Sequence, residues 1–137
     1  MEAPVIDLAI DEYKIYSETY QSDPIVYRLI GDSYANINNF QEAIINYRKA
    51  SELYNFENIP SLYNLGKCYF QLKDFKNAAK YFKSVLRINY DYAEAHSFLV
   101  FTYESLNKYR EAKNECDILY MLDKTLYDSL NVRINSF

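Results

Sequence analysis

The chain has 137 residues, of which 50% are hydrophobic, so its length and composition suffice for one domain with a continuous apolar core. Only 2 glycines and 3 prolines are present, which excludes a turn-rich β-sandwich and a flexible linker, because both need those residues at their bends. The formal net charge of −4 has the wrong sign for a surface that neutralises phosphates, and no apolar run approaches the roughly 20 residues that span a bilayer. We therefore expect no binding to nucleic acid and no membrane insertion.

The predicted helices recur in pairs with a nearly constant period. Residues 27–34 align with residues 62–69 after a shift of 35 positions, and a further shift of 34 reaches residues 96–103. Apolar residues in each segment fall three or four positions apart, which is the spacing of an amphipathic helix and not of a strand. The pattern predicts helices over residues 24–37, 40–54, 59–72, 75–88, 92–106 and 109–122.

Side chains that cap a helix N-terminus stand before the first helix of each pair and before residue 124. They are Asp23, Asn58, Asp91 and Asp123. The turns inside the pairs carry residues 38–39, 73–74 and 107–108, which are rich in asparagine. Asparagine accepts the left-handed backbone that ends a helix better than most residues, so these positions predict the helix ends.

Small residues face aromatic ones at fixed positions of the repeat. We expect the small residues to lie where two helix backbones approach closely, with aromatic rings from the facing helix filling the space above them. The packing positions are Gly31, Tyr34, Ala43, Tyr47, Gly66, Tyr69, Ala78, Phe82, Tyr103 and Ala112. In its period and in this pattern the chain resembles the tetratricopeptide-repeat family. The resemblance implies an all-α fold, a right-handed α-α superhelix of antiparallel helix pairs.

The resemblance divides the chain into one domain of three full repeats between two partial ones. The units are an N-terminal half repeat at 1–23, repeats at 24–57, 58–92 and 93–123, and a capping helix or half repeat at 124–137. The third repeat departs from the pattern, with Val100 at a position for a small residue and Cys116 at one where an aromatic is common.

The apolar residues near the C-terminus are read as the start of another first helix. A shift of 34 places Leu130 and Phe137 under His96 and Tyr103. This segment either caps the third repeat or belongs to a longer array of repeats. Exposed apolar ends would promote self-association of the chain.

No catalytic, cofactor or metal arrangement is recognisable in the sequence. His96 is the only histidine and occupies a repeat position where packing is expected, and Cys68 and Cys116 stand 48 positions apart (116 − 68), which is typical of single buried cysteines. We therefore expect a protein that is not an enzyme and binds no cofactor, unless catalytic parts lie outside these 137 residues. The N-terminus shows no signal-peptide pattern, so we expect a cytoplasmic location.

The resemblance further implies that the first helix of each pair lines a concave groove. Large aromatic residues that are not repeat markers occur at its outward positions, and such residues usually mark a contact site. The predicted groove residues are Arg28, Asp32, Tyr63, Asn64, Lys67, Phe70, Phe98, Phe101 and Glu104. The alternative is that the C-terminal helix or a neighbouring subunit covers these aromatics.

The expected function is a protein–protein interaction module, a scaffold or adaptor that binds a partner peptide or helix in this groove. The alternative function is a dedicated chaperone of a secreted or assembled partner, similar to the small secretion chaperones with three such repeats. The length and the number of repeats suit that alternative as well.

One class of the family grips the C-terminal carboxylate of heat-shock chaperones with lysines, asparagines and an arginine. Only Asn64 stands here at a matching place, whereas Arg28, Asp32, Glu94 and Phe98 replace the other residues. Because the carboxylate of Glu94 would repel the peptide carboxylate, we expect no binding of such chaperone tails.

Overall fold

The computed structural model describes residues 3–134, and every secondary-structure element in that range is an α-helix. The helices are α1 (Ala3–Thr19), α2 (Pro24–Asn36), α3 (Phe40–Leu53), α4 (Ile59–Gln71), α5 (Phe75–Ile88), α6 (Ala93–Ser105), α7 (Tyr109–Leu122) and α8 (Lys124–Ile134). The bounds of α2 to α7 lie within one residue of those expected from the sequence. The predicted all-α fold is confirmed.

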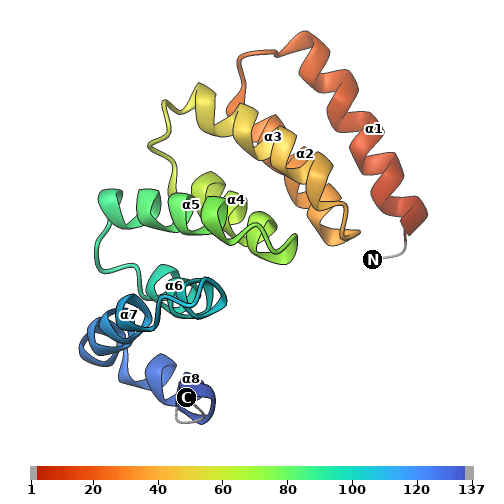
Figure 1. Ribbon diagram of the computed structural model, residues 1–137. Helices are drawn as coiled ribbons and strands as arrows, with labels where there is room; N and C mark the ends of the chain where they lie inside the picture. Colours follow the sequence, from red (N-terminus) through yellow and green to blue (C-terminus); the bar gives the residue numbers. More distant parts are fainter. Residues whose placement is uncertain (1–2, 135–137) are drawn as a thin grey trace.

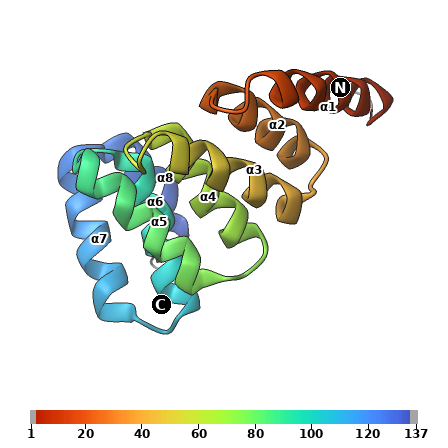
Figure 2. The ribbon, with the colours of Figure 1, turned by 90° about the horizontal axis from the view of Figure 1, so that it is seen from above.

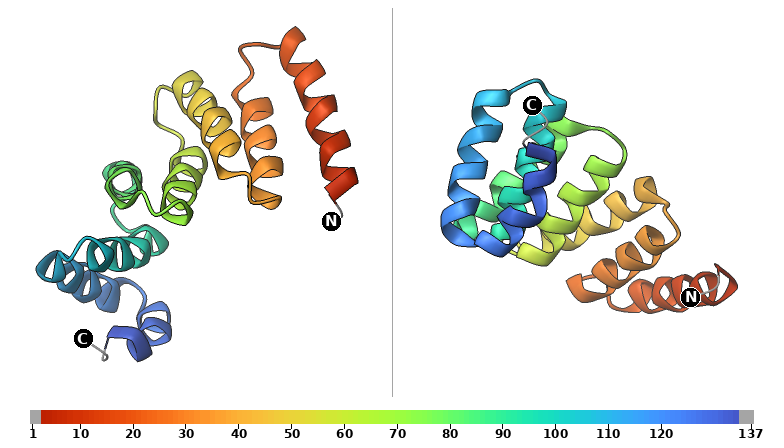
Figure 3. Two further views of the ribbon diagram at one scale, coloured as in Figure 1. Left: turned by 45° about the vertical axis from the view of Figure 1, so that its right-hand side comes forward. Right: turned by 90° about the horizontal axis from the view of Figure 1, so that it is seen from below.

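The helices stack in a curved array (Figure 1). Helix α2 packs on α3, α4 on α5 and α6 on α7, and neighbouring pairs meet through α3 with α4 and α5 with α6. Seen from above, α1 lies at one end of the array and α7 at the other (Figure 2), and in the left view of Figure 3 the red α1 and the blue α8 lie at opposite ends. Such a stack, in which each pair touches only its neighbours, is the architecture of a solenoid.

Three of the four predicted N-caps are confirmed. The side chains of Asp23, Asn58 and Asp123 each accept a hydrogen bond from a backbone N–H in the first turn, at 3.0, 3.0 and 2.9 Å. The prediction for Asp91 is wrong, because α6 begins at Ala93 and the residue before it is Tyr92, which makes no side-chain cap hydrogen bond.

The turns inside the three helix pairs share one backbone conformation. Asn38, Lys73 and Asn107 have φ angles of 60°, 60° and 59°, in the left-handed region. The expectation that these turns end the preceding helices with left-handed backbone is thereby confirmed. Asparagine tolerates this conformation better than most residues, whereas Lys73 takes it without that advantage.

Two glycines allow aromatic rings to lie against the first helix of a pair. A β-carbon at Gly66 would lie 2.7 Å from Cε1 of Phe82, and one at Gly31 would lie 2.7 Å from Cδ1 of Tyr47. Both separations are far below van der Waals contact. The rings of Phe82 and Tyr47 are buried, so the close approach of α4 to α5 and of α2 to α3 depends on glycine.

Helix α8 continues the array, but in a different register from the one expected. It begins 31 residues after α6 (124 − 93), whereas α6 begins 34 residues after α4 (93 − 59). Leu130 lies seven positions after Asp123, which caps α8, and Leu99 lies seven positions after Tyr92, the N-cap of α6 (130 − 123 and 99 − 92). Counted from the helix starts, Leu130 therefore corresponds to Leu99, and the predicted alignment of Leu130 with His96 is wrong by three positions. Phe137 lies outside the described residues. Among the helices that the structure describes, none combines the length and apolarity needed to cross a membrane.

Candidate peptide-binding groove

The nine predicted groove residues lie on three helices that occupy the inner side of the curve in Figure 1. Arg28 and Asp32 lie on α2, Tyr63, Asn64, Lys67 and Phe70 on α4, and Phe98, Phe101 and Glu104 on α6. All nine side chains are partly buried. None stands free in solvent, so each also takes part in the packing of the array.

The carboxylate of Asp32 is the polar centre where the first and second helix pairs meet. Its Oδ1 accepts hydrogen bonds from the hydroxyl of Tyr47 at 2.6 Å and from Nδ2 of Asn64 at 3.4 Å, and its Oδ2 accepts one from Nη1 of Arg28 at 3.3 Å. Burial and this carboxylate raise the pKa of the Tyr47 phenol. Arg28 and Asn64, which are predicted to line the groove, are thus already bonded to Asp32, a third predicted groove residue.

Three of the predicted aromatic anchors form a cluster where the second pair meets the third. The ring of Phe98 stacks on Phe82 with 5.0 Å between centroids, and it meets Tyr63 and Phe70 edge-on at 5.8 and 5.5 Å. These arrangements are favourable for aromatic pairs. Burial, together with the negative charges nearby, raises the pKa of Tyr63 to about 12. The rings therefore extend the core toward the groove.

The ammonium of Lys67 lies over one edge of this cluster. Its Nζ is 4.7 Å from the centroid of the Tyr63 ring, within the range of a cation–π interaction. Lys67 keeps a positive charge at the groove surface between the Asp32 network and the aromatic cluster.

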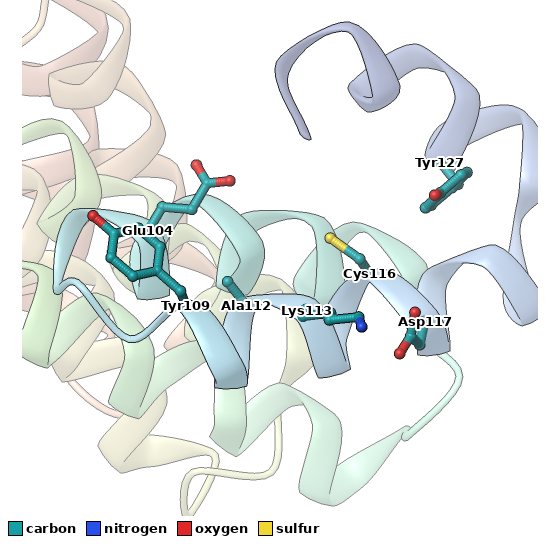
Figure 4. A pocket seen from close by; sticks show the side chains of 7 residues that line it. All are labelled: Glu104, Tyr109, Ala112, Lys113, Cys116, Asp117 and Tyr127. Carbon is teal, nitrogen blue, oxygen red and sulfur yellow. The ribbon is translucent and has the colours of Figure 1, made fainter. Parts of the chain in front are cut away.

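Two of the hollows along the described part of the array are lined in part by predicted groove residues. The smaller has a volume of about 170 Å³ between α3 and α4, and its lining includes Tyr47, Asn64, Lys67 and Gln71. The larger has a volume of about 330 Å³ between α7 and α8, beside the end of α6 (Figure 4). It is lined by Glu104, Tyr109, Ala112, Lys113, Cys116, Asp117 and Tyr127.

A buried ion pair in the third repeat has no counterpart in the sequence prediction. His96 is buried, with Nδ1 at 2.6 Å from Oε2 of Glu115 on α7 and Nε2 at 2.7 Å from the carbonyl oxygen of Tyr90. Burial opposes the charged imidazolium, but the hydrogen bonds to Glu115 and Tyr90 outweigh it and raise the pKa of His96. No local sequence pattern predicts this contact, because Glu115 lies 19 residues from His96 and on another helix.

Both cysteines are buried free thiols. Burial raises the pKa of Cys68 and of Cys116 to about 11, so both stay protonated near neutral pH and are poor nucleophiles. Within residues 3–134, no group of three or more histidine, cysteine, aspartate or glutamate side chains is arranged to hold a metal ion.

Comparison with known proteins agrees with this geometry. Residues 26–56 and 59–89 each match a family model described as the tetratricopeptide repeat. The crystal structure of MamA superposes with a TM-score of 0.82 at 21% sequence identity, covering 87% of this chain and 69% of that one. The first tetratricopeptide-repeat domain of Spaghetti (RPAP3), bound to the HSP90 peptide SRMEEVD, superposes with a TM-score of 0.75 at 24% identity, covering 82% and 88%. At these identities the likeness shows the fold alone. No curated protein matches the sequence.

Proposed function

The chain belongs to the tetratricopeptide-repeat family, and from that premise we propose that it is a scaffold or adaptor that binds a partner's peptide or helix in its concave groove. The repeat is generally a non-catalytic fold that binds other proteins. The observation that carries the proposal is the pair of hollows between successive helix pairs, because Asn64, Lys67 and Glu104 of the predicted groove line them.

The groove is organised before any partner arrives. Asp32 is held by three side chains, and Phe98 is held between the rings of Phe82, Tyr63 and Phe70. A surface that is already ordered loses little conformational entropy on binding, so contacts with the partner translate more fully into affinity. A cytoplasmic location remains part of the proposal, for which the free thiols of Cys68 and Cys116 offer support.

Self-association through the terminal helices is a second element of the proposal. Val5, Leu8 and Ile15 on α1 are 52%, 65% and 67% exposed, and among the described helices α1 packs mainly on α2. An uncovered apolar face of this kind favours contact between copies of the chain. Size-exclusion chromatography with light scattering measures this association directly.

The groove is tested with the double variant Phe70→Ala/Phe101→Ala. We expect it to weaken binding of a partner captured by the wild-type chain at least tenfold, because partly buried aromatics on the inner helices supply apolar contact area. Partners are identified by mass spectrometry, and affinity for the purified partner is then measured by calorimetry. Circular dichroism checks that the variant keeps its helices.

The matched control is Ile45→Ala/Met121→Ala, which removes two exposed apolar side chains from α3 and α7, in the outer layer of the array. This control should leave the affinity within about twofold, a change of less than about 0.5 kcal/mol. Equal affinity of the groove variant and the wild type for every captured partner would contradict the groove proposal.

The peptide SRMEEVD, seen in the related repeat domain, should show no saturable binding to this chain. The reason is that Arg28 and Asn64 already bond the carboxylate of Asp32, and Glu94 adds a repelling charge. Fluorescence polarisation of the labelled peptide measures this. Saturable binding that is lost in an Asn64→Ala variant would show that the groove does accept a terminal carboxylate.

A further inference from the structure

A hollow with a volume of about 680 Å³ lies between α3 and α5, and the buried residues Leu62 and Tyr69 of α4 are part of its lining. One face of α5 forms a wall of this α3–α5 hollow, because its lining residues recur every three or four positions. They are Asn77, Lys80, Tyr81, Ser84 and Arg87. The amide of Asn77 is already engaged, since its Nδ2 donates a hydrogen bond to Oδ2 of Asp74 at 2.7 Å.

Three cations line the α3–α5 hollow, and no aspartate or glutamate is among its described lining residues. The cations are Arg48, Lys80 and Arg87, and all three side chains are exposed to solvent. In the described part of the chain none of them forms an ion pair with a carboxylate. Glu52, one turn after Arg48, lines an adjoining hollow that shares only Arg48 with this one. A local charge of +3, in a chain with 15 basic and 19 acidic residues, favours an anionic ligand.

Two buried tyrosines connect Arg48 with Lys80. Nη2 of Arg48 donates a hydrogen bond to the hydroxyl oxygen of Tyr69 at 2.5 Å. The ring of Tyr69 stacks on that of Tyr81 with 5.5 Å between centroids, and Nζ of Lys80 lies 5.4 Å from the centroid of Tyr81. Because the Tyr69 oxygen accepts from the guanidinium, its own proton is available for donation to an anion. Two positive charges and a polarised hydroxyl are thus held in one row before any ligand arrives.

These groups match a phosphate monoester better than a carboxylate. A phosphate monoester carries a charge of about −1.5 to −2 at neutral pH and three acceptor oxygens, and a guanidinium can bind two of these oxygens at once. Its charge balances Arg48 and Lys80 together, and a third oxygen can accept from the Tyr69 hydroxyl. A single carboxylate would leave one cation unbalanced, and an exposed pair of single charges contributes little to affinity.

Arg87 extends the charged wall beyond the place of one phosphate. It follows Lys80 by seven positions (87 − 80), which is two helical turns on the same face and roughly 10 Å along α5. An extended peptide covers roughly this distance with three residues. An acidic residue three positions from a phosphorylated one would therefore reach Arg87. The length of this wall and the volume of the hollow suit a peptide segment rather than a free phosphate ion.

We propose that the α3–α5 hollow binds a phosphorylated segment of a partner protein, with the phosphate between Arg48 and Lys80 and an acidic residue three positions away at Arg87. None of the nine predicted groove residues lines this hollow. The site is therefore a second binding surface, separate from the groove of the proposed function.

The site is tested by nuclear magnetic resonance titration of the isotope-labelled chain at physiological ionic strength. The probe is acetyl-EGG-phosphoserine-GGE-amide, which carries a glutamate three positions away on either side because either chain direction is possible. We expect saturable chemical-shift changes in α3 and α5 around Arg48 and Lys80. Analogues with serine or glutamate in place of phosphoserine should bind at least tenfold more weakly. Peptides with carboxylates alone, SRMEEVD included, should not saturate the site.

Two double variants of α5 separate the hollow from the overall charge. Lys80→Gln/Arg87→Gln removes two lining cations and should lower affinity for the phosphopeptide at least tenfold. Lys76→Gln/Lys83→Gln removes two exposed cations of the same helix that do not line the hollow, so it changes the net charge equally and should lower affinity less than threefold. Nζ of Lys83 lies instead over the ring of Tyr103, 5.6 Å from its centroid. The spectrum of each variant reports whether the fold is kept.

The role of Tyr69 in positioning Arg48 is tested without a change of charge. Tyr69→Phe keeps the ring and removes the hydroxyl that accepts from the guanidinium, so it should weaken phosphopeptide binding about threefold or more. In an Arg48→Gln background the same substitution should have a smaller effect, because the guanidinium that it positions is absent. Equal effects in both backgrounds would contradict this role.

Each other outcome overturns the proposal in a defined way. Equal affinity for the phosphoserine and glutamate peptides, or equal losses in the two double variants, leaves only a general attraction between charges. Inorganic phosphate that binds as tightly as the phosphopeptide assigns the hollow to a small anion. A dimer that Lys80→Gln/Arg87→Gln dissociates assigns it to a second copy. If the phosphopeptide does not bind while Phe70→Ala/Phe101→Ala still weakens binding of the captured partner, the groove function stands and this proposal alone fails.

Discussion

Replacing Phe82 with alanine is expected to lower the free energy of unfolding by about 3–5 kcal/mol. The ring is completely buried, it stacks on Phe98, and it covers the backbone of Gly66. Its loss leaves a cavity where α4, α5 and α6 meet, and the stacked helices can close it only in part. Urea unfolding followed by circular dichroism measures the change, which is a large part of the roughly 5–15 kcal/mol that stabilises an ordinary domain. Phe82→Leu should lose less, because it keeps most of the buried apolar volume.

The substitution Gly66→Ala tests whether Gly66 and the ring of Phe82 are coupled in their contributions to the free energy of unfolding. In the wild type the new β-carbon meets Phe82 at 2.7 Å, so we expect a loss of about 1–3 kcal/mol even though alanine is the better helix former by about 1 kcal/mol. In the Phe82→Ala background the clash is absent, and the same substitution should be neutral or stabilising. Equal effects in the two backgrounds would show that the close contact has no energetic consequence.

Replacing Glu115 with glutamine is expected to lower the pKa of His96 and to remove a pH-dependent contribution to stability. Because the folded state raises the pKa of His96, the contribution is fully present below the unfolded value of about 6.5 and is lost as pH rises through the folded value. Hydrogen bonds to charged groups contribute about 1.5–3 kcal/mol. The difference in unfolding free energy between wild type and variant should therefore be fully present below about pH 6.5 and shrink as the pH rises through the folded pKa of His96.

His96 is the only histidine, so its resonance in a nuclear magnetic resonance titration reports this pKa without assignment. The matched control is Glu111→Gln, which removes an exposed carboxylate from the same helix and should leave both the titration and the pH dependence unchanged. A histidine that titrates identically in the wild type and in Glu115→Gln would contradict the ion pair.

For the groove residues, the repeat pattern predicts the helix face on which each residue lies but not the contacts that its side chain makes. Phe98 differs from the repeat markers, so its position on an outward face was readable from spacing. Its ring nevertheless lies on Phe82, because the side chain of Phe98 on α6 extends to α5 of the preceding repeat. Arg28 and Asn64 were likewise identified as groove residues, whereas their shared bond to Asp32 depends on how α2 and α4 are set side by side.

Helix positions, turns and the repeat were available from local information, because apolar spacing, capping side chains and left-handed turn residues act within a few residues of one another. Tertiary packing alone decided three features. They are the register of α8, the pairing of His96 with Glu115 and the stacking of Phe98 on Phe82 between α5 and α6. These contacts join residues from different helices, and their geometry depends on how closely successive pairs approach. Within the first two pairs an aromatic ring lies on a glycine, whereas the third pair has Val100 and Cys116 at these positions. The side-chain volumes at these positions set how closely the helices approach, and their effect appears only when the helices are stacked.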